Sequence, residues 1–449
     1  MVENNQLDIE EIVRDSFDEN ETEQLAEKLD QLEPEEIAFA LEAMPLEQRV
    51  GTWLTLEKEQ QIASLTYMRV DARSNIFKQL ETAQLHELVE EIDVDDLIEL
   101  LDELPDAIYQ YACSRLDQSE KRWLDQALTY DDEQCGRYAD HDVLILSKNA
   151  KVRDAVRLFK KLTEDAEYQE ALFVVDRTGR YVGLLQGIRL LGQPNHMPVV
   201  EFIDAEAPVV QGDMGLDEGS DLVARSGYSA LAVVDSEGKL LGRLSIGEAL
   251  ENVRRSLEGQ FMHTAGLDEE EDLFAPIINS AKRRALWLGI NLLTAFLAAW
   301  TIGLFEATLQ QVVALAVLMP IVASMGGIAG SQTLTLMIRG LALEQITPKT
   351  YMTLLRKELG VGAINGLLWA LVIAAITYFW FGDWIIGAVI GMAIVINIVA
   401  AAISGVMIPI WLEKLNIDPA LSGSVILTTV TDVIGFFAFL GLGSLFLLA

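Results

Sequence analysis

The chain has 449 residues and a formal net charge of −35, yet its mean hydropathy is positive at +0.26. These values describe different regions: positions 285–449 carry five basic and seven acidic side chains, so positions 1–284 carry a net charge of −33. Acidity of this density repels nucleic acid and anionic lipid, and it favours cations, divalent ions most of all. A merely solvated acidic surface is the equal alternative. The sequence thus predicts an acidic soluble part followed by a nearly uncharged membrane part.

Residues 1–129 have the pattern of short amphipathic helices separated by proline. The clearest copies are Leu-Glu-Ala-Met-Pro at 41–45 and Leu-Asp-Glu-Leu-Pro at 101–105. Proline ends one helix, and nearby acidic residues favour the N-terminus of the next. We therefore expect an acidic, α-helical, superhelical N domain. An acidic cluster in it either faces a bound cation or caps a helix, and the cap is the favoured interpretation. The cluster consists of Asp93, Asp95 and Asp96.

An internal repeat follows, in which the segment 173–183 recurs as 232–242. Each copy has the pattern of a strand, an Asp-x-x-Gly turn and a strand, and a helix-like segment precedes each one. The repeat predicts two α/β modules, 130–196 and 197–256. It resembles a tandem pair of CBS domains, which implies an intramolecular pair that senses a ligand, with adenine nucleotide as one ligand class. No residue identifies a base pocket, and residues 244–248 depart from the Thr-x-Asp-Asp-like ending of that family.

Acidic side chains in and after the second module are candidates for a cation-sensing interface. Taken singly, each is more readily explained as a solvated surface residue. They are Asp217, Asp221, Glu248, Glu251 and Glu258. Residues 257–284 are expected to form a connecting helix that couples this sensor to the membrane part.

Five apolar stretches are long enough to cross a bilayer, which takes about 20 helical residues. They run from 285 to 305, 309 to 325, 359 to 381, 384 to 411 and 419 to 448, and together they predict a transmembrane domain over 285–449. Positive charges lie before the first stretch, between the second and third, and between the fourth and fifth. Because such charges favour the cytoplasmic side, we expect a multi-pass protein of the cytoplasmic (inner) membrane, with its N-terminus in the cytoplasm and its C-terminus outside.

The second stretch runs into a segment with one proline and three glycines, residues 320–332. At membrane depth this composition allows unwound or closely approached backbone, whose carbonyls can face a cavity. If the helix continues instead, three small or polar residues fall on one stripe at i, i+4 and i+8. They are Gly327, Ser331 and Thr335.

The fifth stretch contains a carboxylate in an otherwise apolar setting, Asp432. A charge centred in a bilayer costs roughly 2.5 to 3.5 kcal/mol on insertion scales, so such residues face a bundle interior or a watery path. A cation-handling role is the favoured interpretation, and a hydrogen-bonded Asp that joins helices is the alternative. The matching stripe consists of Ser424, Thr428 and Asp432. Together the two stripes offer an all-oxygen lining of the kind that Mg²⁺ prefers.

These residues carry a resemblance to a known family. The segment 320–332, the residues 338–343 after it, and the fifth stretch from 418 to 432 resemble the MgtE family of magnesium channels. The resemblance implies a homodimer with a central Mg²⁺ pathway, in which Asp432 matches the pore aspartate of the family. Two positions depart from the family: Ile328 stands where Asn is usual, and Ser424 stands where Pro is usual. The first departure bears on selectivity among divalent cations.

The chain is thus interpreted as a multidomain membrane protein that moves divalent cations, Mg²⁺ most of all. We expect it to close when cations bind between its acidic domains and neutralise their repulsion. A non-conducting, membrane-anchored CBS sensor and a proton-coupled carrier that uses Asp432 are the alternatives. An enzyme is not expected, because no nucleophile–base constellation is present and all four histidines precede residue 285.

Overall fold

The computed structural model describes residues 9–17, 25, 28–160, 171–268, 270–343, 345–415 and 417–448. The chain forms two compact units. The first unit contains Met1–Gly259 and Glu269–Pro276, and the second contains Gln260–Asp268 and Ile277–Ala449. A short segment just before the first long apolar helix therefore returns to the first unit.

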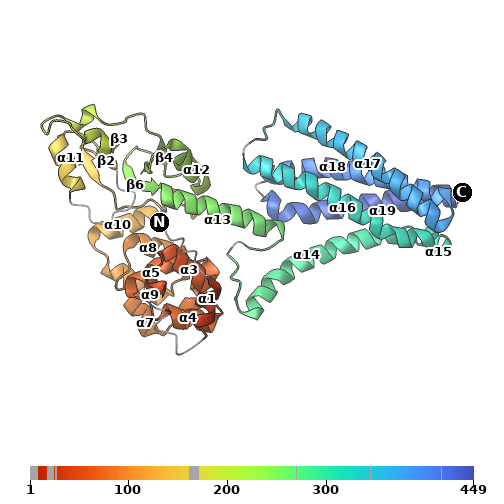
Figure 1. Ribbon diagram of the computed structural model, residues 1–449, viewed down its shortest axis with the longest axis horizontal. Coiled ribbons are helices and arrows are strands. Elements are labelled where there is room, and N and C mark those ends of the chain that lie inside the picture. The colour runs from red at the N-terminus through yellow and green to blue at the C-terminus, as the bar shows by residue number, and fades with distance from the viewer. Residues whose placement is uncertain are drawn as a thin grey trace. The chain divides into compact units, whose positions relative to one another are not determined.

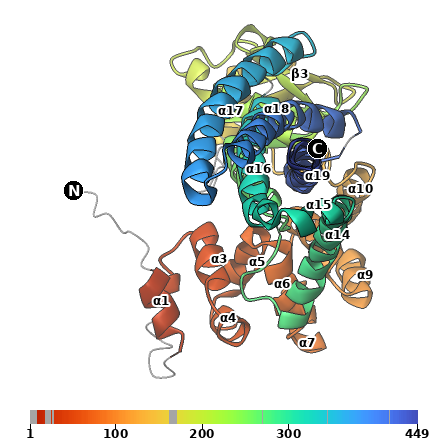
Figure 2. The same cartoon turned by 90° about the vertical axis from the view of Figure 1, so that its right-hand side faces the viewer.

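The N-terminal part of the first unit is a stack of short helices (Figures 1 and 2). The helices are α1 (Ile9–Asp15), α3 (Pro34–Glu42), α4 (Leu46–Trp53), α5 (Lys58–Tyr67), α6 (Val70–Phe77), α7 (Thr82–Leu88), α8 (Val94–Leu100), η1 (Leu101–Glu103), α9 (Asp106–Arg115) and α10 (Gln118–Ala127). Pro45 and Pro105 each lie immediately before a helix, α4 and α9, with an acidic residue in its first turn. The predicted all-helical N domain is confirmed.

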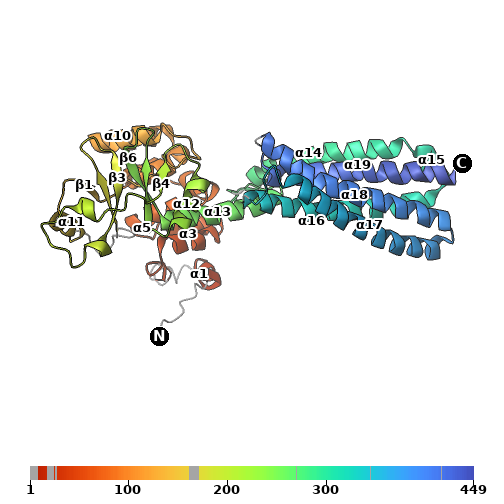
Figure 3. The same ribbon diagram turned by 90° about the horizontal axis from the view of Figure 1, so that it is seen from above.

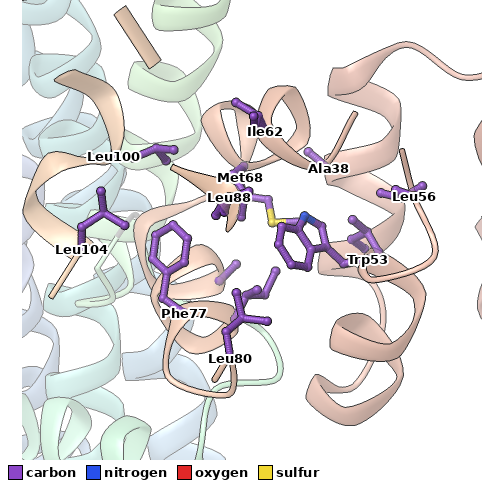
Figure 4. Packing of buried hydrophobic residues seen from close by; sticks show 14 of the residues in the cluster. Ala38, Trp53, Leu56, Ile62, Met68, Phe77, Leu80, Leu88, Leu100 and Leu104 are labelled. Atoms are coloured by element: carbon purple, nitrogen blue, oxygen red, sulfur yellow. The ribbon is translucent and has the colours of Figure 1, made fainter. Parts of the chain in front are cut away.

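One apolar core joins these helices, and Trp53 is its largest fully buried side chain. Figure 4 shows its indole beside Met68, with Phe77 and Leu88 nearby. The indole Nε1 donates a hydrogen bond to the Gln61 carbonyl at 3.1 Å, so its polar atom is satisfied inside the core. The stack therefore behaves as a single body.

The rest of the first unit contains two three-stranded sheets of the same topology, as the repeat predicts. In each sheet the first strand pairs in parallel with the second, and the second pairs antiparallel with the third. The strands are β1 (Ile145–Ser147), β2 (Ala171–Val175), β3 (Tyr181–Gln186), β4 (Val209–Gln211), β5 (Ala230–Val234) and β6 (Leu240–Ser245). Helices α11 (Val152–Phe159) and α12 (Leu216–Ser226) each follow a first strand, and short turns η2 (Gly187–Leu190) and η3 (Val199–Glu201) follow β3.

The Asp-x-x-Gly turns of the two modules have the same construction. The Asp176 carboxylate accepts hydrogen bonds from the backbone amides of Thr178 and Arg180, and Gly179 has a φ of 84°. Asp235 does the same for the amides two and four residues on, and Gly238 has a φ of 77°. Glycine is needed at this left-handed position, so the turn signature has a local physical cause.

The module boundary at residue 130 does not describe how the chain packs. Cys135 and Ala139 belong to the core of the second module, with Val210 and Val233, although in sequence they lie at the start of the first module. Backbone pairing between Asp140 and Arg243 continues this arrangement. The chain thus contributes to the second module before it forms the first.

The connecting segment differs from the single helix expected over 257–284. Helix α13 (Ile246–Thr264) begins directly after β6 and ends before Gly266, which has a φ of 72°. The next helix, α14, begins only at Ile277. A glycine adopts the left-handed conformation at little cost, so Gly266 ends α13 where one continuous connecting helix was expected.

Five helices of the second unit are long and apolar enough to cross a membrane, which confirms the predicted number of spans. They are α14 (Ile277–Gly303), α16 (Val313–Ala342), α17 (Tyr351–Phe381), α18 (Trp384–Lys414) and α19 (Pro419–Leu447), with short α15 (Glu306–Gln311) before α16. The second span is not the expected 309–325: helix continues through Pro320 and the glycines to Ala342. Unwound backbone there was the wrong alternative, because a helix satisfies its own hydrogen bonds in apolar surroundings.

Figure 3 shows these helices running side by side, with α18 among the others. Helix α18 is the most buried of the five spans. Its glycines allow α17 to approach closely, because a Cβ at Gly387 would lie 2.8 Å from the Ala374 carbonyl oxygen and one at Gly391 3.2 Å from that of Ala370. Gly387 and Gly391, four residues apart on one face of α18, thus form a close helix contact with α17.

Candidate functional site

A groove of about 830 Å³ lies on the second unit between α16 and α19. Its wall is made by ten residues: Ala323, Ser324, Gly327, Ile328, Ser331, Gln332, Thr335 and Leu336 from α16, and Thr428 and Asp432 from α19. Along α16 the lining residues recur with helical spacing, so they form one face. The other face, which includes Val322, Gly326 and Gly330, is buried against the bundle.

The groove brings together five of the six residues expected to line a pore. Gly327, Ser331 and Thr335 lie on its α16 wall, and Thr428 and Asp432 on its α19 wall. Ser424 is not part of the wall. Its backbone carbonyl accepts a hydrogen bond from the Thr428 hydroxyl at 2.9 Å, so its contribution is to orient that hydroxyl.

The expected stripe contains three of the eight α16 residues on the wall, and Ile328 was recognised from the sequence only as a departure from the family. Ser324 and Gln332 add a hydroxyl and an amide to the oxygen-bearing surface, and Ile328 adds an apolar side chain that is 59% exposed. The sequence positions of these residues could have indicated their place on the wall, since each lies within four positions of the Gly327 stripe. A stripe drawn at a strict i, i+4 spacing is narrower than the face of a real helix.

Asp432 is the one acidic residue on the groove wall, and no basic residue shares that wall. Within the described ranges it has neither an ion pair nor a hydrogen bond to another side chain. The helix-joining alternative requires such a partner. The geometry instead presents a carboxylate to an open groove whose wall also contains hydroxyl and amide side chains.

Interlocking side chains explain why α16 and α19 lie so close together. A Cβ on Gly330 would lie 2.9 Å from a methyl of Leu427, and one on Gly423 would lie 3.1 Å from a methyl of Leu334. Each helix thus offers a glycine where the other places a leucine. The fifth span also begins as expected: the Asp418 carboxylate accepts a bond from the Ala420 amide at 2.8 Å, with Pro419 at the first helical position.

The acidic residues proposed for regulation lie in several places in the first unit. Asp93 caps α8 by accepting from the Asp96 amide at 2.8 Å, which is the contact that the favoured interpretation expects of one member of that cluster. Asp95 contacts the His141 ring at 2.7 Å. Burial, and then the charges of Asp93, Asp95 and Glu99, raise the pKa of Asp96 to about 7.

The other five candidates also have partners. Asp221 pairs with Arg225 at 2.6 Å, and Glu248 accepts from the Ser245 amide at 2.6 Å at the start of α13. Asp217, Glu251 and Glu258 line one cleft of about 520 Å³, whose walls come from the N domain, α12 and α13. Within the described parts of the chain, no three His, Cys, Asp or Glu side chains form a group that could hold a metal ion.

The acidic residues share this cleft with arginines, whose role the sequence did not indicate. Three ion pairs join the N domain to α13 across it. They are Arg254–Glu35 at 2.6 Å, Arg69–Glu258 at 3.1 Å and Arg255–Glu99 at 3.7 Å. Glu251 also pairs with Arg254 at 2.9 Å and with Arg255 at 3.2 Å. Arginines of the chain itself thus compensate part of the acidic charge in this cleft.

Comparison with known proteins gives consistent matches over most of the sequence. A family model described as MgtE, divalent cation transporter, matches residues 319–442. A model of the MgtE intracellular N domain matches 32–133, and the CBS domain model matches 135–185 and 197–255.

Two curated relatives are similar along nearly their whole length. The magnesium transporter MgtE of Bacillus subtilis is 27% identical over 436 residues, with 93% of each chain covered. That of Thermus thermophilus is 26% identical over 444 residues, with 97% of this chain and 98% of the relative covered. Among solved structures, the cytosolic domain of the Mg²⁺ channel MgtE in complex with ATP matches 54% of this chain and 98% of its own, with a TM-score of 0.47 and 23% identity.

Proposed function

This chain belongs to the MgtE family, whose members transport divalent cations, and we propose that it conducts Mg²⁺ along the groove at Asp432. One observation carries the proposal: the only carboxylate of the groove has no basic partner on that wall and shares it with side chains that carry hydroxyl and amide groups. Mg²⁺ prefers oxygen ligands and gives up its waters reluctantly. With roughly 30 Å³ for each water, a groove of 830 Å³ accommodates the ion with its first hydration shell.

A second copy of the chain is part of this proposal. The groove is open along one side, and its exposed α16 face includes the large apolar side chains Ile328 and Leu336. A homodimer with its axis along the groove would cover this face and set two Asp432 carboxylates opposite each other. Two such carboxylates repel unless a cation or a proton lies between them, so the closed pathway would select for positive charge.

The direction of transport follows from the proposed orientation. Positive charges before α14 and in the α16–α17 and α18–α19 connections favour a cytoplasmic N-terminus and an outer C-terminus. The membrane potential, worth about 2.3 kcal/mol per charge at 100 mV, then draws a divalent cation inward. No phosphate-binding loop of the P-loop type is present in the sequence to supply another energy source.

The acidic first unit is proposed to gate this pathway. Its cleft between the N domain and α13 contains Glu42, Glu99, Glu251 and Glu258, and at low cation concentration their repulsion opposes the three bridging ion pairs. Mg²⁺ entering the cleft would remove the repulsion and hold the parts together. An adenine nucleotide at the CBS pair stays a prediction, to be tested by whether ATP raises the melting temperature of the protein.

Uptake into vesicles tests the conduction proposal. Purified protein in vesicles that contain a Mg²⁺-sensitive dye should admit Mg²⁺ in proportion to the applied potential, and Asp432→Asn should not. Equal leak with and without protein would contradict conduction and leave the anchored sensor. Uptake that follows an inward proton gradient and is abolished by its collapse would instead identify the proton-coupled carrier.

Limited proteolysis tests the gating proposal. Millimolar Mg²⁺ should protect the cleft-lining segments of the full chain, and Ca²⁺ at the same ionic strength serves as the control for screening. Identical cleavage with and without Mg²⁺ would contradict gating by cation binding.

A further inference from the structure

One amide side chain occupies the centre of the membrane unit. Asn397 lies on α18 and is completely buried. Apart from Ser404, it is the only side chain with an amide or hydroxyl between Trp384 and Trp411. Burying an amide among apolar groups is unfavourable unless it is hydrogen-bonded, so a specific contact is expected.

That contact is with the backbone of the groove-lining helix α16. The Asn397 Nδ2 donates a hydrogen bond to the Val322 carbonyl oxygen at 2.8 Å. Its Oδ1 is buried without a hydrogen-bond partner among the described residues, so the amide is held from one side only. The bond fixes α18 to the turn of α16 that begins the groove wall.

Two glycines leave the space that the amide fills, one on each groove helix. A Cβ on Gly435 of α19 would lie 2.6 Å from the Asn397 Nδ2, and a Cβ on Gly326 of α16 would also collide with that nitrogen. Gly326 immediately precedes the groove residue Gly327, and Gly435 follows Asp432 by less than one helical turn. Asn397 itself does not line the groove.

We propose that Asn397 is a positioning residue for cation transport: it acts as a spacer that sets the separation of α16 and α19 behind the groove. The proposal rests on conduction at Asp432. A shorter side chain lets the two helices approach or rotate, and the Asp432 carboxylate then lies at a different distance from the oxygens of the α16 wall. The ion-binding groups all remain present, but their geometry changes.

The first test removes the spacer without touching the groove. Asn397→Ala should lower the maximal rate of Mg²⁺ uptake about tenfold, the scale of one lost buried hydrogen bond. Thr377→Val is the matched control, since Thr377 is a fully buried polar residue of α17 that does not line the groove. That variant should keep the wild-type rate.

Size compensation separates spacing from general stability. Gly435→Ala alone should abolish most uptake because its methyl group collides with the amide, whereas Gly435→Ala combined with Asn397→Ala should recover a large part of it. Gly360→Ala, where a Cβ meets nothing within 4 Å, should have no effect. Melting in detergent shows which variants are folded.

The outcomes distinguish this proposal from the one it rests on. Wild-type uptake with no loss in Asn397→Ala, or with no recovery in the double variant, overturns the spacer and leaves conduction standing. Absence of uptake by the wild type overturns conduction, and with it the role given to Asn397. Loss followed by recovery supports both.

A different observation concerns the segment that precedes the first membrane span. Asp272 is buried in the N domain, where the guanidinium of Arg49 contacts both carboxylate oxygens at 2.7 and 2.8 Å. Asn75 and the Phe274 amide bond to the same carboxylate at 3.2 and 3.0 Å. Glu270 adds a bond to the Val70 amide at 2.6 Å, at the start of α6.

The binding position for this segment is built into the N domain. The Arg49 Nε donates to the Leu41 carbonyl, and Nη2, which also bonds Asp272, donates to the carbonyls of Glu42 and Met44. These carbonyls lie where α3 ends, so the helix terminus holds the guanidinium in place. Burial raises the pKa of Asp272, but the bonds and charge of Arg49 outweigh it and bring that pKa below its usual range. Asp272 is therefore ionised at neutral pH.

We infer that the Arg49–Asp272 pair transmits movement of the N domain to α14. Helix α14 begins at Ile277, shortly after Asp272. A connection of about five residues extends to at most about 18 Å, so a larger displacement of the N domain must move the start of α14. The inference rests on the proposed gating and supplies a second route for it, besides α13.

The test measures regulation of uptake rather than uptake alone. In inside-out vesicles of the full chain, Asp272→Ala should retain uptake at low Mg²⁺ on the cytoplasmic face and require about tenfold more Mg²⁺ there for inhibition. Glu87→Gln, which removes the exposed Lys58–Glu87 pair from the same domain, is the control and should behave as wild type.

Proteolysis of the same samples reports the release of the segment. Residues 265–276 should become cleavable in Asp272→Ala while the helices of the N domain stay protected. Wild-type regulation that persists unchanged in Asp272→Ala overturns the inference. Absence of regulation in the wild type overturns the gating proposal itself and the role of the pair in it.

Discussion

The groove of the membrane unit and the cleft of the acidic unit both contain carboxylates, but only the cleft places arginines among them. The groove has Asp432 and no basic residue on its wall. The cleft has nine acidic residues and four arginines; they are Glu35, Glu42, Glu99, Asp132, Glu133, Asp217, Glu251, Glu258 and Glu270, with Arg69, Arg73, Arg254 and Arg255. A net charge of −33 over positions 1–284 therefore does not mean that acidic charge is available at every site.

The difference matters for what each site requires of a cation. In the groove a cation meets a carboxylate directly. In the cleft it must first displace a guanidinium, or enter beside one, and exposed ion pairs of this kind contribute only about 0.2 to 1 kcal/mol each. A divalent ion at millimolar concentration can therefore displace them, which suits a sensor better than a transport path.

The largest expected effect is that of removing the uncompensated carboxylate. Asp432→Asn keeps the shape of the side chain and removes its charge, so Mg²⁺ uptake should fall by about a hundredfold or more, the scale of a strong charge–cation contact. The measurement is dye-reported uptake into vesicles. Asp383→Asn changes another carboxylate of the same unit, which caps α18 through the Ile385 amide, and should leave uptake unchanged. Equal loss in both variants would mean that the groove has no special role.

The next largest effect is expected on the free energy of unfolding, when the buried Asp272 carboxylate loses its arginine partner. Arg49→Met leaves Asp272 without its main partner, and breaking such a pair costs about 3 to 5 kcal/mol in the free energy of unfolding. Glu87→Gln, in an exposed pair, should cost less than about 1 kcal/mol. Urea unfolding followed by tryptophan fluorescence measures both. Similar costs for the two variants would contradict the burial of the Arg49–Asp272 pair.

The same pair predicts a pH dependence. Because the folded pKa of Asp272 lies below its ordinary value, its contribution is complete above the unfolded pKa of about 3.9 and is lost as the pH falls through the lower, folded value. Wild type should therefore lose stability on acidification below about pH 4 more steeply than Asp272→Asn, which has no carboxylate to protonate there. Parallel acid transitions of the two proteins would contradict this assignment.

Removing one arginine from the cleft should have a smaller effect, on the Mg²⁺ concentration that protects the cleft from proteolysis. Arg255 pairs with Glu251 and Glu99, so Arg255→Gln removes one of the two arginine partners of each carboxylate and leaves Arg254 and Arg73. Protection from proteolysis should then appear at a Mg²⁺ concentration about threefold lower, the scale of one exposed ion pair. Arg225→Gln, which frees Asp221 outside the cleft, is the matched control and should not shift the midpoint. An upward shift in Arg255→Gln would show that the arginines, not cations, hold this cleft together.

Local patterns in the sequence predicted the features that have local causes. The five spans follow from runs of apolar residues, the paired sheets from an Asp-x-x-Gly turn with its left-handed glycine, and the wall at Gly327 and Asp432 from helical spacing. The glycine-rich part of α16 was ambiguous, because the same residues permit unwinding and close packing. The contact between Gly330 and Leu427 shows that this part of α16 packs closely and does not unwind. Leu427 lies on a different helix, far along the chain, so the sequence near Gly330 could not indicate this contact.

Partners distant in sequence could not be predicted in the same way. Arg49 and Asp272 are 223 residues apart, and nothing near either of them identifies the other. Asn397 was recognisable as a polar residue in an apolar stretch, yet the two glycines that make room for it lie on other helices. Charge counting had the same limit: it gave the sum for positions 1–284 correctly but not which carboxylates face arginines.

The smallest expected effect tests whether an acidic cluster is a cation site or a cap. Asp93 accepts a bond from the Asp96 amide at the start of α8, so Asp93→Ala should lower the free energy of unfolding by about 1 kcal/mol. Asp93→Ser can still accept that bond and should recover most of the loss without restoring the charge. If the residue instead holds a cation, Mg²⁺ will stabilise the wild type more than the serine variant. A cap predicts the same Mg²⁺-induced shift in melting temperature for both, because the hydroxyl replaces everything that the carboxylate does there.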